Sequence, residues 1–233
     1  KELDKANVLV LGASGNLGIE VCRELASRGA NLWLQANSNA VRLVEFEKSN
    51  LLFCNFADGD AVDIFIDEIN DSGVLFDYVI NLAEVTEGDF MMVNAYSPVK
   101  ILNSIVGKIG KCVLNVGSAV EDLNFDSEDS SWASSKRAFH GYLASASGEY
   151  AKYGIRSVYI QLGFINGGFT KHLPPKSVFK FMVKSRQEDF LEVKEVAEKL
   201  VNALYIPRQI GVKYCYENLM LVGRLGYDEP KVD

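Results

Sequence analysis

A glycine-rich turn between an apolar run and an amphipathic segment restricts the fold of this chain more than any other feature. Val8–Leu11 is a short, wholly apolar run, typical of a strand that a parallel sheet buries on both faces. The turn follows at residues 12–18, and Leu17, Val21 and Leu25 then recur every four residues, which predicts a helix. A strand that leads through a glycine turn into a helix presents backbone N–H groups that can bind a diphosphate.

The glycines of this turn have the spacing GxxGxxG, which permits a tight bend and close approach of the backbone to a ligand. A mononucleotide P-loop is excluded because no Gly-Lys-Ser/Thr follows. A hydrolase nucleophile turn is excluded because Asn16 stands where its last glycine would be. Dinucleotide binding is therefore predicted, and a glycine turn without a ligand is the alternative. The expected cofactor contacts in the turn are Gly12, Ser14, Gly15, Asn16, Leu17 and Gly18.

Apolar runs and helix-like segments alternate along the rest of the chain. Further strands are predicted at Asn31–Leu34, Leu51–Phe53, Tyr78–Leu82, Cys112–Val116, Ser157–Leu162 and near Gly211–Tyr216. Further helices are predicted at Ala61–Ile69, Phe90–Val106, Ser134–Tyr153 and Val193–Leu204. This alternation predicts an α/β fold, a doubly wound (Rossmann-type) parallel sheet with helices on both faces, in which residues 1–233 form a single domain.

The composition limits the environment and the partners of the chain. Lys and Arg number 24 against 31 Asp and Glu, and the net charge of −7 disfavours binding to nucleic acid. No apolar run approaches the ~18–20 residues that cross a bilayer, so no membrane association is expected. The four cysteines are widely spaced and only two histidines are present, which argues against a metal site. Scattered thiols fit a reducing cytoplasm, the predicted location.

The end of the second predicted strand bears on which dinucleotide is bound. An acidic residue there accepts the ribose hydroxyls of NAD and repels the additional phosphate of NADP. Residues 35–38 include no acid, and Arg42 follows within reach of a phosphate. The sequence therefore favours NADP over NAD, with Asn37 and Ser38 as contacts. The alternative is that these neutral residues simply cap a helix.

Several segments together resemble the short-chain dehydrogenase/reductase superfamily. They are the glycine turn, the strand end Asn81-Leu82-Ala83, and the pair formed by Ser118 and Lys136. The likeness extends from Val8 to about Glu217, and the segment Leu162–Ile165 is most similar to the beta-ketoacyl-carrier reductases. The resemblance implies a nicotinamide-dependent oxidoreductase.

In that family an Asn, a Ser, a Tyr and a Lys form the catalytic group. The Tyr hydroxyl passes a proton to the substrate carbonyl while NAD(P)H gives hydride, and the Ser holds the substrate oxygen. The Lys binds the nicotinamide ribose and lowers the pKa of the Tyr, and the Asn supports a proton path through water. The resemblance assigns these roles to Asn94, Ser118 and Lys136, whereas the tyrosine position is occupied by Trp132.

Trp132 makes proton delivery the open question of the expected site. An indole only donates its N–H, whereas a phenol both gives and takes a proton. Losing a positioned general acid typically lowers a rate by ~10²–10⁴. Tyr142 and Tyr150 fall in an apolar stripe of the same predicted helix and are expected to pack. His140, four residues past Lys136, is expected to be a surface or packing residue, with a substitute acid as the alternative.

Other positions also depart from the family pattern. Glu84 replaces a glycine after the fourth strand and brings a carboxylate near the expected nicotinamide ribose. The Pro-Gly pair after the sixth strand is Leu162-Gly163, and the threonine that commonly touches the carboxamide is Gly167, with Thr170 close by. The resemblance implies further cofactor contacts for Asn55, Phe56, Asn81, Leu82, Ala83, Lys136, Gly163 and Ile165.

Residues 164–190 correspond to the substrate lid of the family. They hold five basic residues against two acidic ones, and Pro174 and Pro175 are expected to interrupt the helix. This charge suits an anionic small-molecule or carrier-bound substrate, and the alternative is a solvated helical face over packed aromatic residues. The resemblance also implies a homodimer or homotetramer that pairs through the helices predicted at Phe90–Val106 and Ser134–Tyr153.

Three hypotheses follow for the function. The first is an NAD(P)(H)-dependent enzyme that reduces a carbonyl or oxidises an alcohol, with water or another hydroxyl in place of the phenol. The second is a cofactor-binding but catalytically inactive partner of an active paralogue, with a regulatory or structural role. The third is a deliberate change at Trp132 made to trap a complex. Retention of Asn94, Ser118 and Lys136 favours the first, and the departures around them favour the second.

Overall fold

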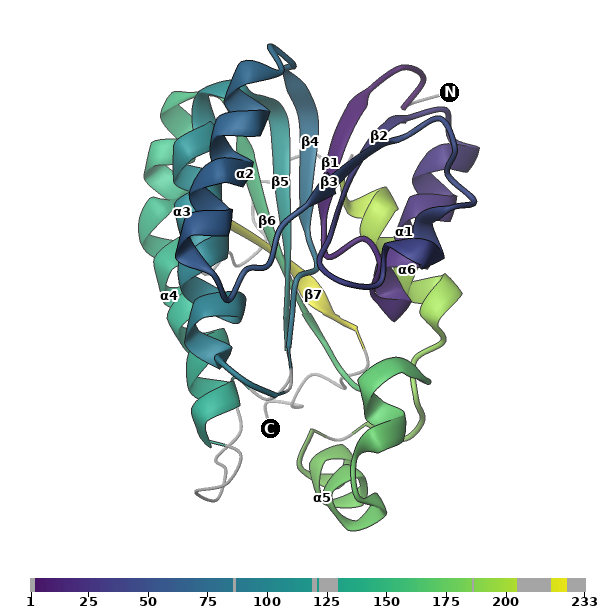
Figure 1. The fold of residues 1–233 in the computed structure, drawn as a ribbon. Coiled ribbons are helices and arrows are strands. Elements are labelled where there is room, and N and C mark those ends of the chain that lie inside the picture. Colours follow the sequence, from purple (N-terminus) through teal and green to yellow (C-terminus); the bar gives the residue numbers. More distant parts are fainter. Residues whose placement is uncertain are drawn as a thin grey trace.

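A seven-stranded parallel sheet forms the centre of the molecule, with strand order β3-β2-β1-β4-β5-β6-β7 (Figure 1). The structure is a computed structural model and describes residues 3–85, 87–118, 121, 130–185, 187–204 and 219–225. The strands are β1 (Asn7–Leu11), β2 (Asn31–Ala36), β3 (Asn50–Phe53), β4 (Phe76–Asn81), β5 (Ile109–Ser118), β6 (Arg156–Leu162) and β7 (Leu219–Leu225). The order reverses at β1, which pairs with both β2 and β4. Ligands of such sheets bind outside the carboxyl ends of the strands at this reversal.

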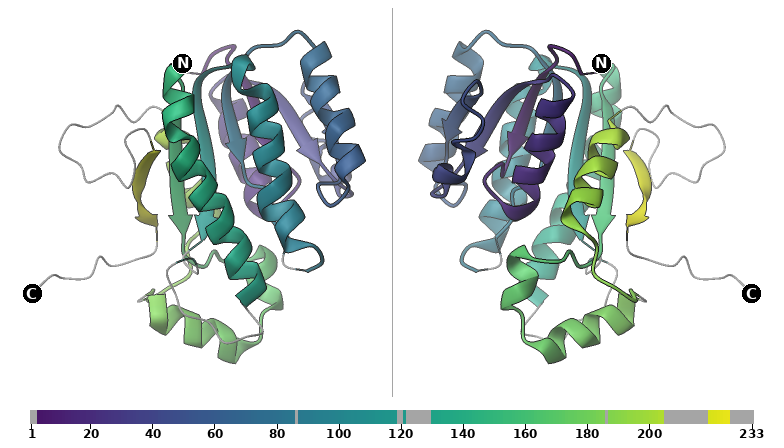
Figure 2. Two further views of the ribbon diagram at one scale, coloured as in Figure 1. Left: turned by 90° about the vertical axis from the view of Figure 1, so that its left-hand side faces the viewer. Right: turned by 90° about the vertical axis from the view of Figure 1, so that its right-hand side faces the viewer.

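Helices cover both faces of the sheet (Figure 2). They are α1 (Asn16–Ser27), α2 (Gly59–Asp71), α3 (Ser97–Ile105), α4 (Ser130–Lys152), α5 (Pro175–Ser185) and α6 (Val193–Ala203). Short 3-10 turns lie at η1 (Ala40–Leu43), η3 (Val106–Lys108) and η5 (Gly168–His172), and η2 (Met92–Tyr96) is a π-helical turn. Helices α1 and α6 pack on one face, and α2, α3 and α4 on the other. Helix α5 lies beyond the carboxyl ends of the strands (Figure 1).

Alternation along the strands divides the core into two halves. In β1, Val8 and Val10 face α1 and α6, whereas Leu9 and Leu11 face α2, α3 and α4. All four side chains are fully buried, as expected for a strand at the centre of a parallel sheet. The burial of apolar surface on both faces fixes the register of the central strands, and with it the position of the turns that follow them.

The predicted fold class is confirmed. The strand β7 (Leu219–Leu225) begins beyond the last predicted strand, and two further differences lie at proline residues. The helix predicted at Phe90–Val106 is divided, because Pro98 has no N–H to donate to the carbonyl of Asn94. The π-helical turn η2 therefore precedes α3, which begins at Ser97. The expectation that Pro174 and Pro175 interrupt a helix is wrong, since α5 begins at Pro175, where the missing N–H costs no hydrogen bond. The strand predicted near Gly211–Tyr216 lies outside the described residues.

In the part of the chain that the structure describes, no helix is both long enough and apolar enough to cross a membrane.

Candidate active site

A pocket of about 470 Å³ lies at the carboxyl edge of the sheet. Its walls come from five segments that are far apart in sequence: the start of α1, the chain after β4, the end of β5, α4, and the chain after β6. The residues that line it are Gly15, Asn16, Leu17, Leu82, Glu84, Val85, Glu87, Val116, Gly117, Ser118, Trp132, Leu162, Gly163, Phe164, Ile165, Gly167, Gly168 and Thr170. The lining thus includes two carboxylates and no Lys or Arg among the described residues.

The glycine turn is packed too tightly for side chains at two of its positions. Gly12 has φ of +77°, and a Cβ there would lie 2.7 Å from the backbone nitrogen of Ala83. A Cβ on Gly18 would overlap the carbonyl oxygen of Gly12. Among the described residues no side chain caps the start of α1 at Gly15, so its first-turn N–H groups can donate to a ligand.

The adenosine side of the expected site lies outside this pocket. Asn37 and Ser38 are exposed directly after β2, and Arg42 donates from Nη1 to the carbonyl oxygen of Ser14 over 2.8 Å. The carboxamide oxygen of Asn55 accepts from the N–H of Ala57 over 3.1 Å.

Phe56 belongs to the hydrophobic core rather than to the surface of this region. It is 4% exposed and its ring lies 6.1 Å from that of Phe65. Its carbonyl oxygen accepts from the hydroxyl of Ser97 over 2.6 Å. The Phe56 side chain therefore faces away from the expected adenine position, and a contact there would use the backbone.

The end of β4 is fixed against the glycine turn by backbone hydrogen bonds. The N–H of Leu82 donates to the carbonyl of Leu11 over 2.9 Å, and the side-chain oxygen of Asn81 accepts from the N–H of Ala83 over 3.2 Å. Leu82 then lines the pocket, whereas Asn81 and Ala83 lie behind its wall. Chain geometry thus directs the next residue, Glu84, into the pocket.

Glu84 contacts two residues of α4 that lie one helical turn apart. The indole Nε1 of Trp132 donates to Oε1 of Glu84 over 3.0 Å, and Nζ of Lys136 lies 3.2 Å from Oε2. The Lys136 side chain is only 4% exposed, whereas that of Glu84 is 32% exposed. The sequence predicted a carboxylate near Lys136, and the structure brings it into direct contact with both Lys136 and Trp132.

Asn94 connects three elements behind the pocket. Its side-chain oxygen accepts from the N–H of Val85 over 2.9 Å, and its Nδ2 donates to the carbonyl of Val85 over 3.2 Å. The same Nδ2 donates to the hydroxyl of Ser135 over 3.1 Å, which joins η2 to α4. Because Val85 follows Glu84, these bonds hold the backbone that carries the carboxylate.

Ser118 ends β5 and lines the pocket beside Trp132. Its backbone N–H donates to Oε1 of Glu121 over 2.6 Å. The Glu121 carboxylate, 1% exposed, also accepts from the hydroxyl of Tyr159 over 2.5 Å and from Nε2 of Gln161 over 3.1 Å. Nδ1 of His140 lies 3.0 Å from its Oε2. Three hydrogen-bond donors from β5 and β6, and the imidazole of His140 on α4, thus surround one buried carboxylate next to Ser118.

Glu121 and Tyr159 were missed by sequence reasoning. One signal could have indicated them. Tyr159 and Gln161 are two residues apart in a strand predicted to be buried, so they lie on the same face, and their buried polar groups require a hydrogen-bond partner. Gly117 is part of the same arrangement, because a Cβ there would overlap the Tyr159 hydroxyl and the Glu121 carboxylate. His140, expected as a surface or packing residue, stacks on the Tyr159 ring at 4.3 Å.

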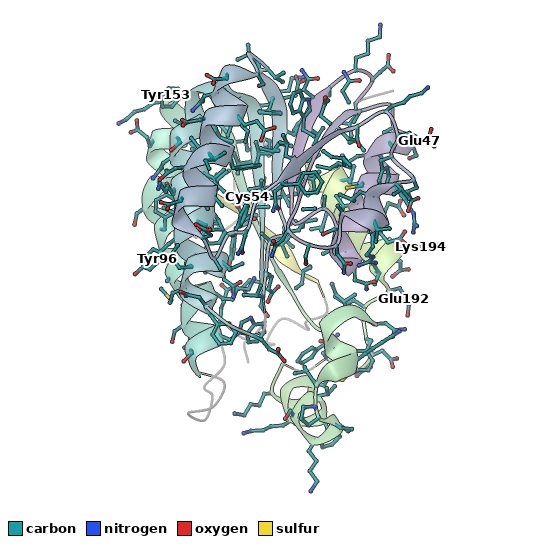
Figure 3. All side chains as sticks on the ribbon, in the orientation of Figure 1. Glu47, Cys54, Tyr96, Tyr153, Glu192 and Lys194 are labelled. Carbon is teal, nitrogen blue, oxygen red and sulfur yellow. The ribbon has the colours of Figure 1, made fainter. Side chains whose placement is uncertain are left out.

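Hydrogen bonds hold the beginning of the chain after β6 against its end and against the residues that precede α6. The side chain of Gln187 accepts from the N–H of Phe164 over 2.7 Å and donates to its carbonyl over 2.8 Å. Nδ2 of Asn166 donates to Glu192 over 3.0 Å. Glu192, labelled in Figure 3, directly precedes α6. Gly163 and Ile165 line the pocket, and Ile165 forms an isolated parallel bridge with Leu191. Residues 164–190 therefore form a folded segment over one side of the pocket.

The thiols of the described residues are buried and have no catalytic setting. Burial raises the pKa of Cys112 to about 11 and that of Cys54 to about 12. Burial likewise raises the pKa of Cys22. Within the described ranges, no group of three or more His, Cys, Asp or Glu side chains could hold a metal ion.

Comparison with known proteins gives the family. Residues 6–177 match the short chain dehydrogenase family, which covers more than half of the chain. A bovine (Bos taurus) protein named 3-oxoacyl-[acyl-carrier-protein] reductase is 25% identical over 223 residues, which are 87% of this chain and 94% of that protein. The chain belongs to the short chain dehydrogenase family, a family of oxidoreductases, as predicted from the glycine turn and from Ser118 and Lys136.

Solved structures share the fold at low sequence identity. A short-chain dehydrogenase/reductase from Serratia marcescens superposes with a TM-score of 0.77 at 18% identity, covering 97% of this chain and 99% of that one. The complex of BdcA with NADPH has a TM-score of 0.70 at 21% identity and covers 88% of each chain.

Proposed function

We propose that this chain is an NADP-dependent oxidoreductase that interconverts an alcohol and a carbonyl compound without a tyrosine as proton donor. One observation carries the proposal: a single pocket joins the start of α1 to Ser118, Trp132 and Glu84. A bound nicotinamide dinucleotide supplies or accepts the hydride. The chain itself must bind the diphosphate, orient the substrate oxygen and move a proton.

The residues around the glycine turn fit such a cofactor. The compact turn at Gly12 and Gly18 keeps side chains away from the start of α1, whose N–H groups and positive dipole end suit a diphosphate. Ser118, at the end of β5, lines the pocket together with Trp132 and is the hydroxyl that would hold the substrate oxygen. Trp132 directs its only donor to Glu84, so it contributes no acid or base.

The preference for NADP rests on the charge next to the glycine turn. No carboxylate follows β2 at residues 36–39, and the Arg42 guanidinium bonds to the carbonyl of Ser14. A cation at this position attracts the additional phosphate of NADP. The BdcA structure, which shares the fold, contains NADPH.

The nucleotide preference is tested by titrating the protein with NADPH and NADH and following tryptophan fluorescence. We expect quenching with tighter binding of NADPH. Replacing Arg42 (R42A) should weaken NADPH binding by about tenfold, because it removes a charge-assisted hydrogen bond to phosphate, and should leave NADH binding unchanged. R23A serves as the control, since Arg23 pairs with Glu20 and Glu45 on the outer surface. If R42A weakens the binding of NADPH and of NADH by the same factor, the proposed preference for NADP is contradicted.

We infer a substrate that is an anionic small molecule or is bound to an acidic carrier. Lys176, Lys180 and Lys184 are exposed along α5, beyond the carboxyl edge of the sheet (Figure 2). The pocket itself contains Glu84 and Glu87, so the negative charge of such a substrate would remain outside it, near α5. The bovine relative is named for a carrier-bound substrate.

A second candidate function is a cofactor-binding but catalytically inactive partner subunit. It is favoured by the contact between Glu84 and Lys136, because a lysine paired with a carboxylate is less available to a nicotinamide ribose. A panel of alcohols, ketones and ketoacyl thioesters, followed at 340 nm, separates the two. Turnover by the unaltered chain supports the enzyme. No turnover, together with activity in a W132Y variant, supports the inactive partner.

Association through α3 and α4 into a homodimer or homotetramer is part of the proposal. Tyr96, the last residue of η2 before α3, and Tyr153, after α4, are more than half exposed on this side of the molecule (Figure 3). Light scattering after size exclusion measures the mass directly, and a monomer would contradict this part.

The proposed location is the cytoplasm, where buried, unpaired thiols such as Cys22 and Cys112 persist.

A further inference from the structure

Glu84 is the titratable side chain in the pocket that contacts the residue at the expected phenol position. It accepts the indole N–H of Trp132 at one carboxylate oxygen and pairs with Lys136 at the other. Each carboxylate oxygen has two lone pairs, so both contacts leave room for a further hydrogen-bond donor. The side chain is 32% exposed, which keeps it open to the pocket and to solvent.

The backbone on both sides of Glu84 is fixed. Ala83 donates its N–H to Asn81, and Val85 exchanges two hydrogen bonds with the side chain of Asn94. Asn94 is in turn bonded to Ser135, next to Lys136 on α4. The carboxylate is therefore held by its backbone and by two side-chain donors, as a preorganised catalytic group requires.

Other candidates for a proton acceptor in this region are already engaged or lie elsewhere. The His140 ring is paired with Glu121 and stacked on Tyr159, and it does not line the pocket. The Glu121 carboxylate accepts hydrogen bonds from Ser118, Tyr159 and Gln161 below the pocket. Glu87 also lines the pocket, but among the described residues no hydrogen bond or ion pair holds its carboxylate.

We propose that Glu84 is the catalytic base of this chain in alcohol oxidation, an inference that rests on the proposed function. A phenol ionises near pH 10 and needs a nearby cation to act as a base at neutral pH, whereas a carboxylate offers two acceptor oxygens. The pair of Trp132 and Glu84 thus replaces the base function of a tyrosine. The indole holds the carboxylate, and the carboxylate takes the proton.

The step balances as a two-electron oxidation. An oxygen of the Glu84 carboxylate takes the hydroxyl proton of a secondary alcohol, and the electron pair of the O–H bond becomes the second bond of the carbonyl. The carbon-bound hydrogen leaves with its electron pair to the oxidised nicotinamide dinucleotide, which is the oxidant. Glu84 then releases the proton to water through its exposed side. In the reverse direction the protonated Glu84 carboxyl delivers the proton to the substrate oxygen.

The test compares Glu84→Gln, Glu84→Ala and Glu84→Asp with the unaltered chain and with Glu47→Gln, a control at an exposed glutamate remote from the pocket (Figure 3). For a secondary alcohol that the unaltered chain oxidises, we expect Glu84→Gln to lower kcat by ~10²–10⁴. Glu84→Asp should keep partial activity, and added formate should restore part of the activity of Glu84→Ala in proportion to its concentration. Glu47→Gln should be unchanged.

Two readouts do not depend on turnover. Titration with NADPH should give the same affinity in Glu84→Gln as in the unaltered chain, within about threefold. In a W33F background, where Trp132 is the remaining tryptophan, Glu84→Ala should shift the emission maximum because the indole loses its charged acceptor. An unshifted emission would overturn the contact and the proposal with it.

The results also separate this inference from the function on which it rests. Oxidation of an alcohol by both the unaltered chain and Glu84→Gln at similar rates would overturn the role of Glu84 and leave the oxidoreductase standing. A higher rate or tighter NADPH binding in Glu84→Ala would also overturn it, since Glu84 would then obstruct the site. Absence of turnover by the unaltered chain, despite NADPH binding, would overturn the proposed function itself.

Discussion

The behaviour of single residues at this site depends on contacts that join distant parts of the chain. Glu84 could be located from sequence because it lies three residues after Asn81, which marks the end of the strand. Its contact with Trp132 could not, because it depends on how α4 is rotated on the sheet. The same reason explains why Glu121 was missed: its donors come from β5, β6 and α4, and no local spacing relates them.

Replacing Glu121 with glutamine should destabilise the protein more than the same replacement at an exposed glutamate. The carboxylate accepts from Ser118, Tyr159 and Gln161, whereas an amide accepts only at its oxygen and directs its N–H₂ at one of these donors. We expect E121Q to lower the free energy of unfolding by roughly 3 kcal/mol, measured by urea denaturation.

The matched control for this prediction is E149Q. Glu149 pairs with Lys152 on the surface of α4, and such exposed pairs contribute at most about 1 kcal/mol. If E121Q and E149Q unfold at the same urea concentration, the buried carboxylate does not stabilise the region below Ser118.

At the scale of elements, periodicity predicts what packs against the sheet, and proline chemistry decides where helices begin. The strands β1 to β6 and most helices were predicted within a few residues of their bounds because their apolar faces are continuous. The strand β7 (Leu219–Leu225) begins beyond the last predicted strand. The division of the helix at η2 follows from the missing N–H of Pro98, a local signal that periodicity overlooks. This division matters for the site, because η2 carries Asn94 toward Val85.

The segment after β6 should loosen when Gln187 is replaced by alanine. Gln187 is 6% exposed and bonds to both backbone groups of Phe164. Q187A removes the side-chain acceptor of the buried Phe164 N–H, whereas the Phe164 carbonyl still accepts from the N–H of Leu191 over 2.9 Å. Because these bonds join the beginning of residues 164–190 to its end, we expect faster proteolysis within this segment. The melting temperature of the sheet should change little.

Limited proteolysis followed by mass spectrometry locates the cleavage sites in Q187A. The control is N166A, which removes a single exposed bond to Glu192 and should be cleaved at a rate close to that of the unaltered chain. Cleavage of Q187A outside residues 164–190 would mean that Gln187 stabilises the whole domain and not this segment.

At the scale of the whole molecule, burial of ionisable groups sets the response to alkaline pH. Burial raises the pKa of Cys112 from 9.0 to about 11 and that of Cys54 from 9.0 to about 12. Burial also raises the pKa of Tyr150. The folded chain therefore keeps protons that the unfolded chain releases above pH 9, so the unfolded state binds fewer protons and stability falls as pH rises.

Each of these two thiols should lower the free energy of unfolding by about 1.4 kcal/mol per pH unit between pH 9 and its folded pKa. Stability should be unaffected by the thiols below pH 8 and should decline between pH 9 and 10.5, as measured by urea midpoints. A C112A variant loses stability at every pH because a side chain is removed, but its decline above pH 9 should be less steep than that of the unaltered chain. If the stability of C112A and that of the unaltered chain decline equally steeply above pH 9, the pKa of Cys112 is not higher in the folded chain than in the unfolded chain.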